Sequence, residues 1–529
     1  MDLKRTILAV ALSMAVLLLF QMYLAPPPPQ GPGAPPPAAS PVEPGVAPPA
    51  PWVTGAPAGE VPATPAVPVR HAVLENDRVT LRLLSRSAAI VEARLKEYRE
   101  TPAPESPDVR LLAAPAGTDL AGAVRLLEAI PEWNQVYEEV EHRPDRVTYS
   151  WTSPAGIRIE KTYSLAPGRY DVDVDVRLRN GAGAALRDRL GLLLVQDFAP
   201  LEDSYSFTGP AYYRGGDFEE VKIKRIRDGV QAPANISWAA LLEKYFLVAA
   251  VPSSPEGTSL RIGSHLGQDK VAEVELLGPV FDLYPGAEAT FSYRIYLGPK
   301  LPAALAPLGA NLDHVAHYGF FHVIAKPLMV FLNAIYGVTG NYGIAIIILT
   351  TVIKAVFWPL SARSFKSMQR MKDLQPKMQR LKDKYGKDRE RMNMEVMQLY
   401  KTHKVNPLGG CLPMLVQIPF FFALYKILLG SIELRHAPFF LWITDLSDKD
   451  PYYITPIVMG ASMLLQQKLT PMTGTNPTQM KMMMYGLPAV FTFMFLNFPS
   501  GLVIYWLVNN LLSIAQQAWM LRRAEPAAA

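Results

Sequence analysis

The sequence predicts an α-helical membrane protein that carries a large antiparallel β-sandwich outside the membrane. Apolar residues make up 50% of the 529 residues, and only 19% are charged, a balance that favours a membrane protein. Long apolar stretches lie at the N-terminus and after residue 338. Between them, about 230 residues alternate repeatedly between apolar and polar side chains, the period of half-buried β-strands.

The N-terminus reads as a membrane anchor followed by a spacer. Thr6 to Leu24 are 19 nearly uninterrupted apolar positions behind Lys4 and Arg5, which suffices to cross ~30 Å of hydrocarbon as a helix. Prolines follow at once, and this disfavours cleavage as a signal peptide. We expect a retained anchor over residues 1–24 and a Pro/Ala-rich linker over residues 25–70, where 17 of the 49 prolines lie.

Residues 71–305 are predicted to form the extracytoplasmic β-sandwich. The clearest strand runs from Tyr170 to Arg179, where one face carries Val172, Val174, Val176 and Leu178. Similar runs lie at Val79 to Leu83, Ile157 to Tyr163, Val271 to Leu277 and Phe291 to Leu297. Short strands separated by Pro/Gly-rich turns indicate a sandwich. We favour a scaffold role for it over a carbohydrate-binding role, which the residues allow but do not require.

Residues 306–338 are predicted to form an amphipathic helix in the membrane interface. The segment from Phe320 to Val338 is apolar and aromatic but is interrupted by His322, Lys326 and Pro327. His314 and His317 have helical spacing, but no third ligand accompanies them. We therefore expect interfacial histidines and no metal site.

Residues 339–529 are predicted to form the helical membrane domain. Five more apolar stretches, which with the anchor make six spans, are Tyr342 to Leu360, Leu412 to Leu429, Tyr452 to Leu469, Met483 to Phe498 and Leu502 to Leu521. Basic residues favour the cytoplasmic side of a membrane. They place both termini and the loop of residues 361–411 in the cytoplasm, with the sandwich on the opposite side.

The loop of residues 361–411 holds 13 Lys/Arg against 5 Asp/Glu, which indicates a cytoplasmic loop or an anionic partner rather than a nucleic-acid-binding protein. Its apolar residues recur every three or four positions on both sides of Gly386, so it should form an antiparallel helical hairpin, kinked at Pro376. Eleven of the 20 methionines lie in this loop and between Met472 and Met484. Methionine suits surfaces that accept many apolar partners. The predicted capture residues are Met368, Met371, Met378, Met480, Met482 and Met483.

A charged residue stands inside the first of these later spans. Lys354 lies toward its cytoplasmic end, where a charge costs about 2.5–3.5 kcal/mol. Its stem could snorkel to the headgroups, or it could face a hydrated cavity together with Thr350 and Gln417; the two interpretations are compatible. Further polar residues in the spans are Gln466, Gln467, Asn509, Asn510, Gln516 and Gln517. The cores of these spans contain no acidic residue, which argues against a proton-coupled pump.

Motifs for enzymatic catalysis are missing. The chain has no GxxxxGK[ST] phosphate loop, no HExxH, no GxSxG and no Cys/His cluster with metal spacing. We therefore expect no enzymatic activity and no cofactor.

Five strings resemble those of the YidC/Oxa/Alb insertase family, in its six-span Gram-negative form. They are GNYGIAIIILT (Gly340 to Thr350), LQPKMQ (Leu374 to Gln379), NPLGGCLP (Asn406 to Pro413), DPYYITPIVMG (Asp450 to Gly460) and FPSGLVIYW (Phe498 to Trp506). The resemblance covers nearly the whole chain and is weaker over the sandwich.

The resemblance implies a five-helix core around a hydrophilic groove that is open to cytosol and lipid but closed toward the periplasm. Groove residues would be Lys354, where the family usually has arginine, together with Thr350, Gln417, Tyr505 and Trp506. Trp506 stands where tyrosine is common. The implied function is insertion and folding of nascent inner-membrane proteins, alone or with the Sec translocon (SecYEG, SecDF). The implied partners are nascent membrane proteins, translating ribosomes and membrane lipids. The alternatives are a secondary transporter and a membrane-anchored periplasmic sugar-binding protein.

Overall fold

The structure is a computed structural model that describes residues 68–529, apart from residues 113–119, 199–205, 317, 386–387, 404–411, 471–480 and 525–529. The predicted anchor, most of the linker, His317 and Met480 lie outside the described residues.

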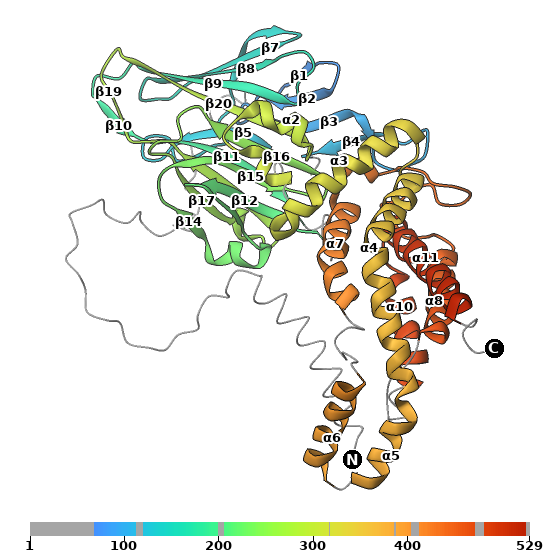
Figure 1. The fold of residues 1–529 in the computed structure, drawn as a ribbon. Helices are drawn as coiled ribbons and strands as arrows, with labels where there is room; N and C mark the ends of the chain where they lie inside the picture. The colour runs from blue at the N-terminus through green and yellow to red at the C-terminus, as the bar shows by residue number, and fades with distance from the viewer. Residues whose placement is uncertain are drawn as a thin grey trace, which may run out of the picture. The chain divides into compact units, whose positions relative to one another are not determined.

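The N-terminal half of the described chain is an antiparallel β-sandwich (Figure 1). The first sheet contains β1 (His71–Glu75), β2 (Val79–Leu84), β3 (Ala89–Arg99), β4 (Asp108–Leu111), β5 (Leu120–Leu126), β11 (Leu190–Asp197), β14 (Val230–Ala232), β17 (Ser259–Ser264) and β18 (Val271–Leu277). The second contains β6 (Glu138–Arg143), β7 (Arg146–Thr152), β8 (Ile157–Leu165), β9 (Asp171–Asn180), β12 (Gly209–Arg214), β13 (Asp217–Glu220), β15 (Ile236–Leu242), β16 (Phe246–Pro252) and β20 (Glu288–Pro299). A small separate pair is β10 (Leu186–Asp188) with β19 (Phe281–Leu283).

The order of strands follows from antiparallel pairing of neighbours. The first sheet runs β1-β2-β3-β5-β11-β18-β17-β14, with β4 beside β3, and the second runs β13-β12-β15-β16-β20-β9-β8-β7-β6. In the register of β9, Val174 lies opposite Tyr163 of β8 and Tyr293 of β20. Side chains that are directly opposite share one face of a sheet, so the apolar positions of the three strands form a single surface.

The core lies between the two sheets. Val172, Val174, Val176 and Leu178 are all 0% exposed, and they belong to one cluster with Leu81 and Val274 of the first sheet. The period-two pattern therefore places one face of each strand in the core, and the predicted sandwich is confirmed.

The C-terminal half is helical (Figure 1). Its helices are α2 (Pro302–Leu305), α3 (His322–Thr339), α4 (Tyr342–Asp373), α5 (Gln375–Tyr385), α6 (Arg389–Thr402), α7 (Leu412–Gly430), α8 (Ile454–Leu469), α10 (Leu487–Phe495) and α11 (Ser500–Ala524). Apolar side chains of α3, α4, α7, α8, α10 and α11 meet in a second core, which includes Leu349, Ile427, Met459, Phe495 and Leu502.

Two helical segments of the described chain are long and apolar enough to cross a membrane, Gly319–Thr339 and Tyr342–Asp373. Val416–Gly430 and Met482–Phe495 are shorter apolar helices. The first long segment contains α3, which we predicted to lie in the interface. It buries Ala325, Met329 and Leu332 on one face and exposes Val330 and other valines on the opposite face. The six-span arrangement stays a prediction.

Helix α4 contains the predicted span from Tyr342 to Leu360 and continues into the first part of the predicted hairpin. Helix α4 begins at Tyr342, where the Asn341 side chain accepts a hydrogen bond from the Ile344 amide, and ends at Asp373. Helix α5 begins directly afterwards, at Gln375. The helical arm is thus interrupted at Leu374, two residues before Pro376, where we predicted a kink. Proline has no amide hydrogen and disfavours helical backbone in the preceding residue, but it fits the first turn of a helix.

Helices α5 and α6 form the expected antiparallel pair. Met378 of α5 accepts a hydrogen bond from the Tyr400 hydroxyl of α6, at 3.3 Å. Asp388 accepts a hydrogen bond from the Arg391 amide and caps the start of α6. The pair is visible as two neighbouring short helices beyond the end of α4 (Figure 1).

Pro488 changes the helix in which it lies. A π-helical turn, Met482–Gly486, precedes α10, which begins at Leu487. A proline clashes with the carbonyl four residues earlier in a regular α-helix, and the wider π-turn is a common way to accommodate such a disturbance.

Candidate functional site

The charged residue Lys354 faces α11 in the structure. Its ammonium group donates a hydrogen bond to the Ser513 hydroxyl, at 2.8 Å. The Ser513 hydroxyl in turn donates to the Asn509 carbonyl, at 2.7 Å. One hydroxyl group can do both, because it has one proton to donate and lone pairs to accept with. In the part of the chain that the structure describes, Lys354 has no carboxylate partner.

Ser513 belongs to a polar stripe on α11. Asn509, Ser513 and Gln516 are four and three residues apart, so they share one face of the helix. The Gln516 amide donates to the Trp358 carbonyl of α4, at 3.4 Å, and Asn509 accepts from the Gln417 amide of α7, at 3.0 Å. The stripe thus connects α11 with both α4 and α7.

A second polar face of α11 lies against α8. The Asn510 amide donates to the Ser462 hydroxyl, at 3.1 Å, and both residues are buried. Gln517 contacts the Thr470 hydroxyl beyond the end of α8, at 3.3 Å. Polar side chains in membrane helices commonly serve as interhelical hydrogen-bond partners, and here α11 supplies them toward three helices.

Two of the predicted groove residues, Thr350 and Tyr505, are buried. The Thr350 hydroxyl donates to the Ile346 carbonyl of its own helix, at 2.6 Å. The Tyr505 ring lies beside Phe421, with 6.3 Å between ring centroids. Trp506 packs among Phe421, Phe491 and Phe495, at centroid distances of 5.1, 5.6 and 5.3 Å. Hence the structure brings Lys354, Thr350 and Gln417 to the faces of helices that meet, with an aromatic cluster beside them.

The predicted capture methionines divide into two groups. Met371 is buried with Leu374, while Met368 and Tyr400 pack against this pair; Met378 contacts Tyr400. These three methionines stabilise the hairpin. Met482 and Met483 are exposed. The exposed hairpin methionines are Met394 and Met397, at 61% and 51%, which our list of single residues omitted.

A groove of about 470 Å³ lies on the outer face of the first sheet, among residues of β1 to β4. Its charged side chains pair with one another: Arg82 and Arg94 with Glu92, Lys96 with Glu75, and Arg99 with Asp108. Each of these charges has a partner, with four basic side chains sharing three carboxylates, so the groove gives no reason to expect a particular ligand.

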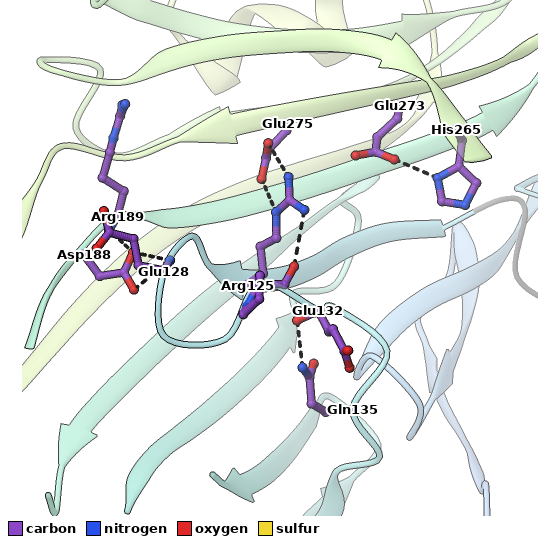
Figure 2. Close-up of polar contacts among 10 residues, drawn as sticks. Arg125, Glu128, Glu132, Gln135, Asp188, Arg189, His265, Glu273 and Glu275 are labelled. Carbon is purple, nitrogen blue, oxygen red and sulfur yellow. Dashed lines mark hydrogen bonds and ion pairs between the residues drawn. The ribbon is translucent and has the colours of Figure 1, made fainter. Parts of the chain in front are cut away.

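A buried polar cluster lies further along the same sheet (Figure 2). Arg125 binds Glu275 with two parallel hydrogen bonds of 2.6 and 2.8 Å, and Glu275 is 0% exposed. A Cβ atom on Gly191 would lie 2.5 Å from the Glu275 carboxylate, so the space for the ion pair depends on this glycine. His265 contacts Glu273 at 2.7 Å.

The cluster holds the segment of residues 127–136 against the sheet. The Asp188 carboxylate accepts from the amide of Glu128 (Figure 2). It also accepts from the amide of Ala129, at 2.9 Å, and Arg125 donates to the Pro131 carbonyl, at 3.3 Å. Trp133 of this segment lies 5.4 Å from the His265 ring. These hydrogen bonds indicate a structural role for Arg125 and Asp188, which hold the segment in place.

Sequence reasoning missed two members of the helical site, Ser513 and Ser462. Serine is common in membrane helices and gives no signal alone. The spacing of Ser513 from Asn509 and Gln516 could have indicated it. Among the described residues, the structure contains no group of three potential metal-ligating side chains.

The comparisons with known proteins assign the chain to a family. Residues 334–527 match the family described as "60Kd inner membrane protein", and residues 71–331 match "YidC periplasmic domain". The chain is 40% identical over 556 residues to "Membrane protein insertase YidC" of Syntrophus aciditrophicus, covering 98% of this chain and 100% of that protein. The chain belongs to the YidC family of membrane protein insertases.

One further relative and one solved structure are similar over most of the chain. The insertase of Oleidesulfovibrio alaskensis is 43% identical over 472 residues, covering 86% of this chain and 87% of that protein. A crystal structure of an active YidC insertase with its first transmembrane domain resolved covers 85% of this chain at 17% identity, with a TM-score of 0.36. Membership makes the chain an inner-membrane protein with a periplasmic domain, and the matched residues assign the sandwich to the periplasm.

Proposed function

We propose that this chain inserts nascent proteins into the inner membrane through the polar faces of α4, α7 and α11. One observation carries the proposal: a lysine and several amide and hydroxyl groups from three apolar helices contact one another, with no acidic residue in the cores of those helices. Such groups lower the cost of moving a short hydrophilic segment into the membrane, because they replace part of its hydration.

Lys354 supplies the charge at this site. An ammonium group without a carboxylate partner favours acidic groups on an incoming segment. Ser513 positions it, and substrate carboxylates would compete with the Ser513 hydroxyl for its hydrogens. The apolar part of the substrate then partitions into lipid, and this transfer drives release.

The route proposed for a substrate begins in the cytoplasm. The exposed methionines Met394, Met397, Met482 and Met483 offer a flexible apolar surface to an emerging segment. The basic hairpin is the proposed contact for translating ribosomes, whose surface is anionic. Cooperation with the Sec translocon, SecYEG and SecDF, belongs to the same proposal.

The orientation and division of the chain follow the same logic. Basic residues near the ends of spans, including Lys4, Lys468 and Arg522, favour cytoplasmic termini. We propose the anchor at 1–24, the linker at 25–70, the periplasmic sandwich at 71–305, the interfacial segment at 306–338, and the insertase domain at 339–529 with its hairpin at 361–411. We also propose that insertion involves no enzymatic step and no cofactor.

Site-specific crosslinking tests the proposal. A photoreactive residue at Thr350, Gln417 or Trp506 should crosslink to the membrane segment of a stalled ribosome–nascent chain. The control position is Val356 of α4, which is exposed on the outside of the helices. Equal crosslinking from Val356 and from the three site positions would contradict a substrate path along the polar faces.

A further inference from the structure

A lysine is buried in the core of the sandwich. Lys161 of β8 is 0% exposed. Every second residue of β8 faces the core, and the other four residues of this row are Ile157, Ile159, Tyr163 and Leu165, all of them buried. A lysine is almost never fully buried unless it is paired. Apolar packing therefore does not explain its presence in this row.

The hydrogen-bond partners of Lys161 are backbone carbonyl groups. Its ammonium group donates to the carbonyls of Ser87, Ala88 and Gly122, at 3.1, 2.5 and 2.5 Å. These carbonyls belong to β5 and to the turn between β2 and β3 in the first sheet, whereas β8 belongs to the second sheet. An ammonium group has three hydrogens and no lone pair, so three acceptors match it. A neutral amine would turn its lone pair toward one of the three oxygens.

The backbone of the first sheet is shaped so that these carbonyls converge. Ser87 and Ala88 have φ angles of 65° and 41°, and residues other than glycine adopt such angles only where the surrounding structure holds them. Gly122 is the extra residue of a β-bulge, because the register between β5 and β11 shifts there. The extra residue of a bulge is left out of the ladder, which makes its carbonyl available to the lysine.

Two tyrosine rings complete the surroundings of the ammonium group. The Nζ atom lies 5.3 Å from the centroid of the Tyr163 ring and 5.8 Å from that of the Tyr137 ring. The faces of aromatic rings attract cations, and backbone carbonyls replace the hydration shell of K⁺ in selective sites. Burial lowers the pKa of Lys161 because it removes water from the charged form, whereas the carbonyls and the rings favour the charged form.

The turn that supplies two of the carbonyls also holds the segment of residues 127–136. The Ser87 amide donates to the Gln135 carbonyl, at 2.7 Å, and the Tyr137 amide donates to the Ser85 carbonyl, at 2.8 Å. This segment is the one that Arg125 and Asp188 fix at its other end. Loss of the contacts of Lys161 should therefore loosen both the turn and the segment.

We propose that the carbonyls of Ser87, Ala88 and Gly122 and the rings of Tyr137 and Tyr163 form a site for a primary ammonium ion, which Lys161 fills from within the chain. The lysine acts as a built-in ligand that holds the two sheets together at the turn of residues 85–88. A free primary ammonium ion should bind in its place once the lysine side chain is removed. The ammonium site belongs to the periplasmic sandwich and does not depend on the proposed insertase site.

Hydrogen–deuterium exchange of the purified full-length protein tests the ammonium site. Mass spectrometry follows exchange in peptides that contain residues 85–90 and 120–137. Three variants are compared with the wild type: Lys161→Ala, Lys161→Met and Lys224→Ala. Lys224 is the matched control, because it is an exposed lysine of the same sandwich. Each protein is measured near neutral pH in equal concentrations of propylammonium, tetramethylammonium or sodium chloride.

The ammonium site predicts a specific pattern. Lys161→Ala leaves the three carbonyls without the ammonium group, and Lys161→Met restores most of the volume but none of the hydrogens, so both variants should exchange several-fold faster than the wild type in these peptides. Propylammonium consists of the three carbons and the nitrogen that Lys161→Ala removes, and it should return this variant toward the wild-type rate. Tetramethylammonium has no N–H group and should not. Lys161→Met, whose side chain fills the space, and Lys224→Ala should not respond to either cation.

Two results would overturn the ammonium site. One is wild-type exchange in folded Lys161→Met protein, which would mean that the hydrogens of the lysine do not hold the turn. The other is an equal effect of the two organic cations on Lys161→Ala.

If the variants do not fold, solid-state NMR of the wild type with ¹⁵N-labelled lysine decides. A charged Nζ that is protected from exchange with solvent supports the site, and a neutral amine at Lys161 excludes it.

Discussion

At the scale of single residues, the hydrogen bond from Lys354 to Ser513 fixes the ammonium group between two apolar helices. A lysine close to the membrane edge could satisfy itself by snorkelling, but here the ammonium reaches across to another helix. An ammonium is a compact donor and cannot bind a carboxylate with the planar fork of arginine. In the proposed site, its contact with a substrate carboxylate therefore lacks the rigid parallel pair of hydrogen bonds that arginine would form.

Lys354→Ala should reduce insertion of substrates with acidic translocated tails. A hydrogen bond to a charged group contributes about 1.5–3 kcal/mol, which corresponds to roughly tenfold or more in yield. Insertion is measured by protease accessibility of the tail in cells depleted of the native insertase. Lys354→Arg, which keeps the charge, should remain active, and a neutral-tailed substrate serves as the control. Unchanged insertion of acidic tails by Lys354→Ala would remove its role.

Arg125 gives a prediction for the periplasmic sandwich. Arg125→Ala leaves the carboxylate of Glu275 buried without its partner, and breaking such a pair costs about 3–5 kcal/mol. Arg143→Ala is the matched control, because Arg143 pairs with Glu141 at an exposed position and such pairs contribute about 0–1 kcal/mol. Chemical denaturation followed by tryptophan fluorescence compares the two. Equal losses would mean that the buried pair is not special.

At the scale of elements, apolar periodicity predicted the strands well but not the junctions of the helices. The alternation of Val172, Val174 and Val176 fits only one secondary structure, a strand with one buried face, because side chains alternate between the two faces of a strand. Pro376, in contrast, is compatible with either a kinked helix or the first turn of a new helix, and the structure ends α4 at Asp373 and begins α5 at Gln375. Likewise Lys354 could be singled out as a costly charge, whereas its partner Ser513 depends on how two distant helices rotate toward each other.

The hairpin methionines should separate capture from stability. Replacing Met394 and Met397 with serine removes exposed apolar surface, so nascent-chain crosslinking to the hairpin should fall several-fold while its stability is retained. Met371→Ala should instead destabilise the hairpin. Met371 is 5% exposed, and truncation of a buried methionine to alanine lowers the free energy of unfolding by about 2–5 kcal/mol. Limited proteolysis of the hairpin measures the second effect. Loss of crosslinking only with the Met371 variant would contradict capture by the exposed pair.

At the scale of the whole molecule, the chain contains two large hydrophobic cores that differ in their surroundings, one in the sandwich and one among the helices. The sandwich core is built from alternating strands and buries many tyrosines. The helical core is surrounded by exposed apolar side chains, such as Val323, Val490 and Phe493, which suit contact with lipid. The two halves should therefore respond differently to pH and to deletion.

Alkaline pH should destabilise the sandwich. Burial raises the pKa of Tyr137, Tyr163 and Tyr293 above the ordinary value. Above about pH 10 an unfolded tyrosine loses its proton, while these stay protonated in the folded state, so the free energy of unfolding falls as the pH rises. Tyrosinate absorbance should appear together with loss of the β-sheet circular dichroism signal. Titration of all tyrosines near pH 10 without unfolding would contradict this.

Deleting the sandwich should spare much of the insertion activity. Removal of residues 71–299, from the start of β1 to the end of β20, leaves the polar faces of α4, α7 and α11 intact. Complementation of an insertase-depleted strain measures the result, with Lys354→Ala in the same shortened chain as the control. Complete loss of function in a stably expressed protein would favour a receptor whose binding activity resides in the sandwich.

Helix α4 also sets how movement passes through the molecule. It is one helix of 32 residues, roughly 48 Å long, with Asn341 as its N-terminal cap, Lys354 in its first half, and α5 and α6 beyond its end. Pro359 lies within it and removes a backbone hydrogen bond between Lys354 and the hairpin. A load applied to α5 and α6 should therefore bend α4 at Pro359 first, so that Lys354 stays in place while the part of α4 beyond Pro359 swings.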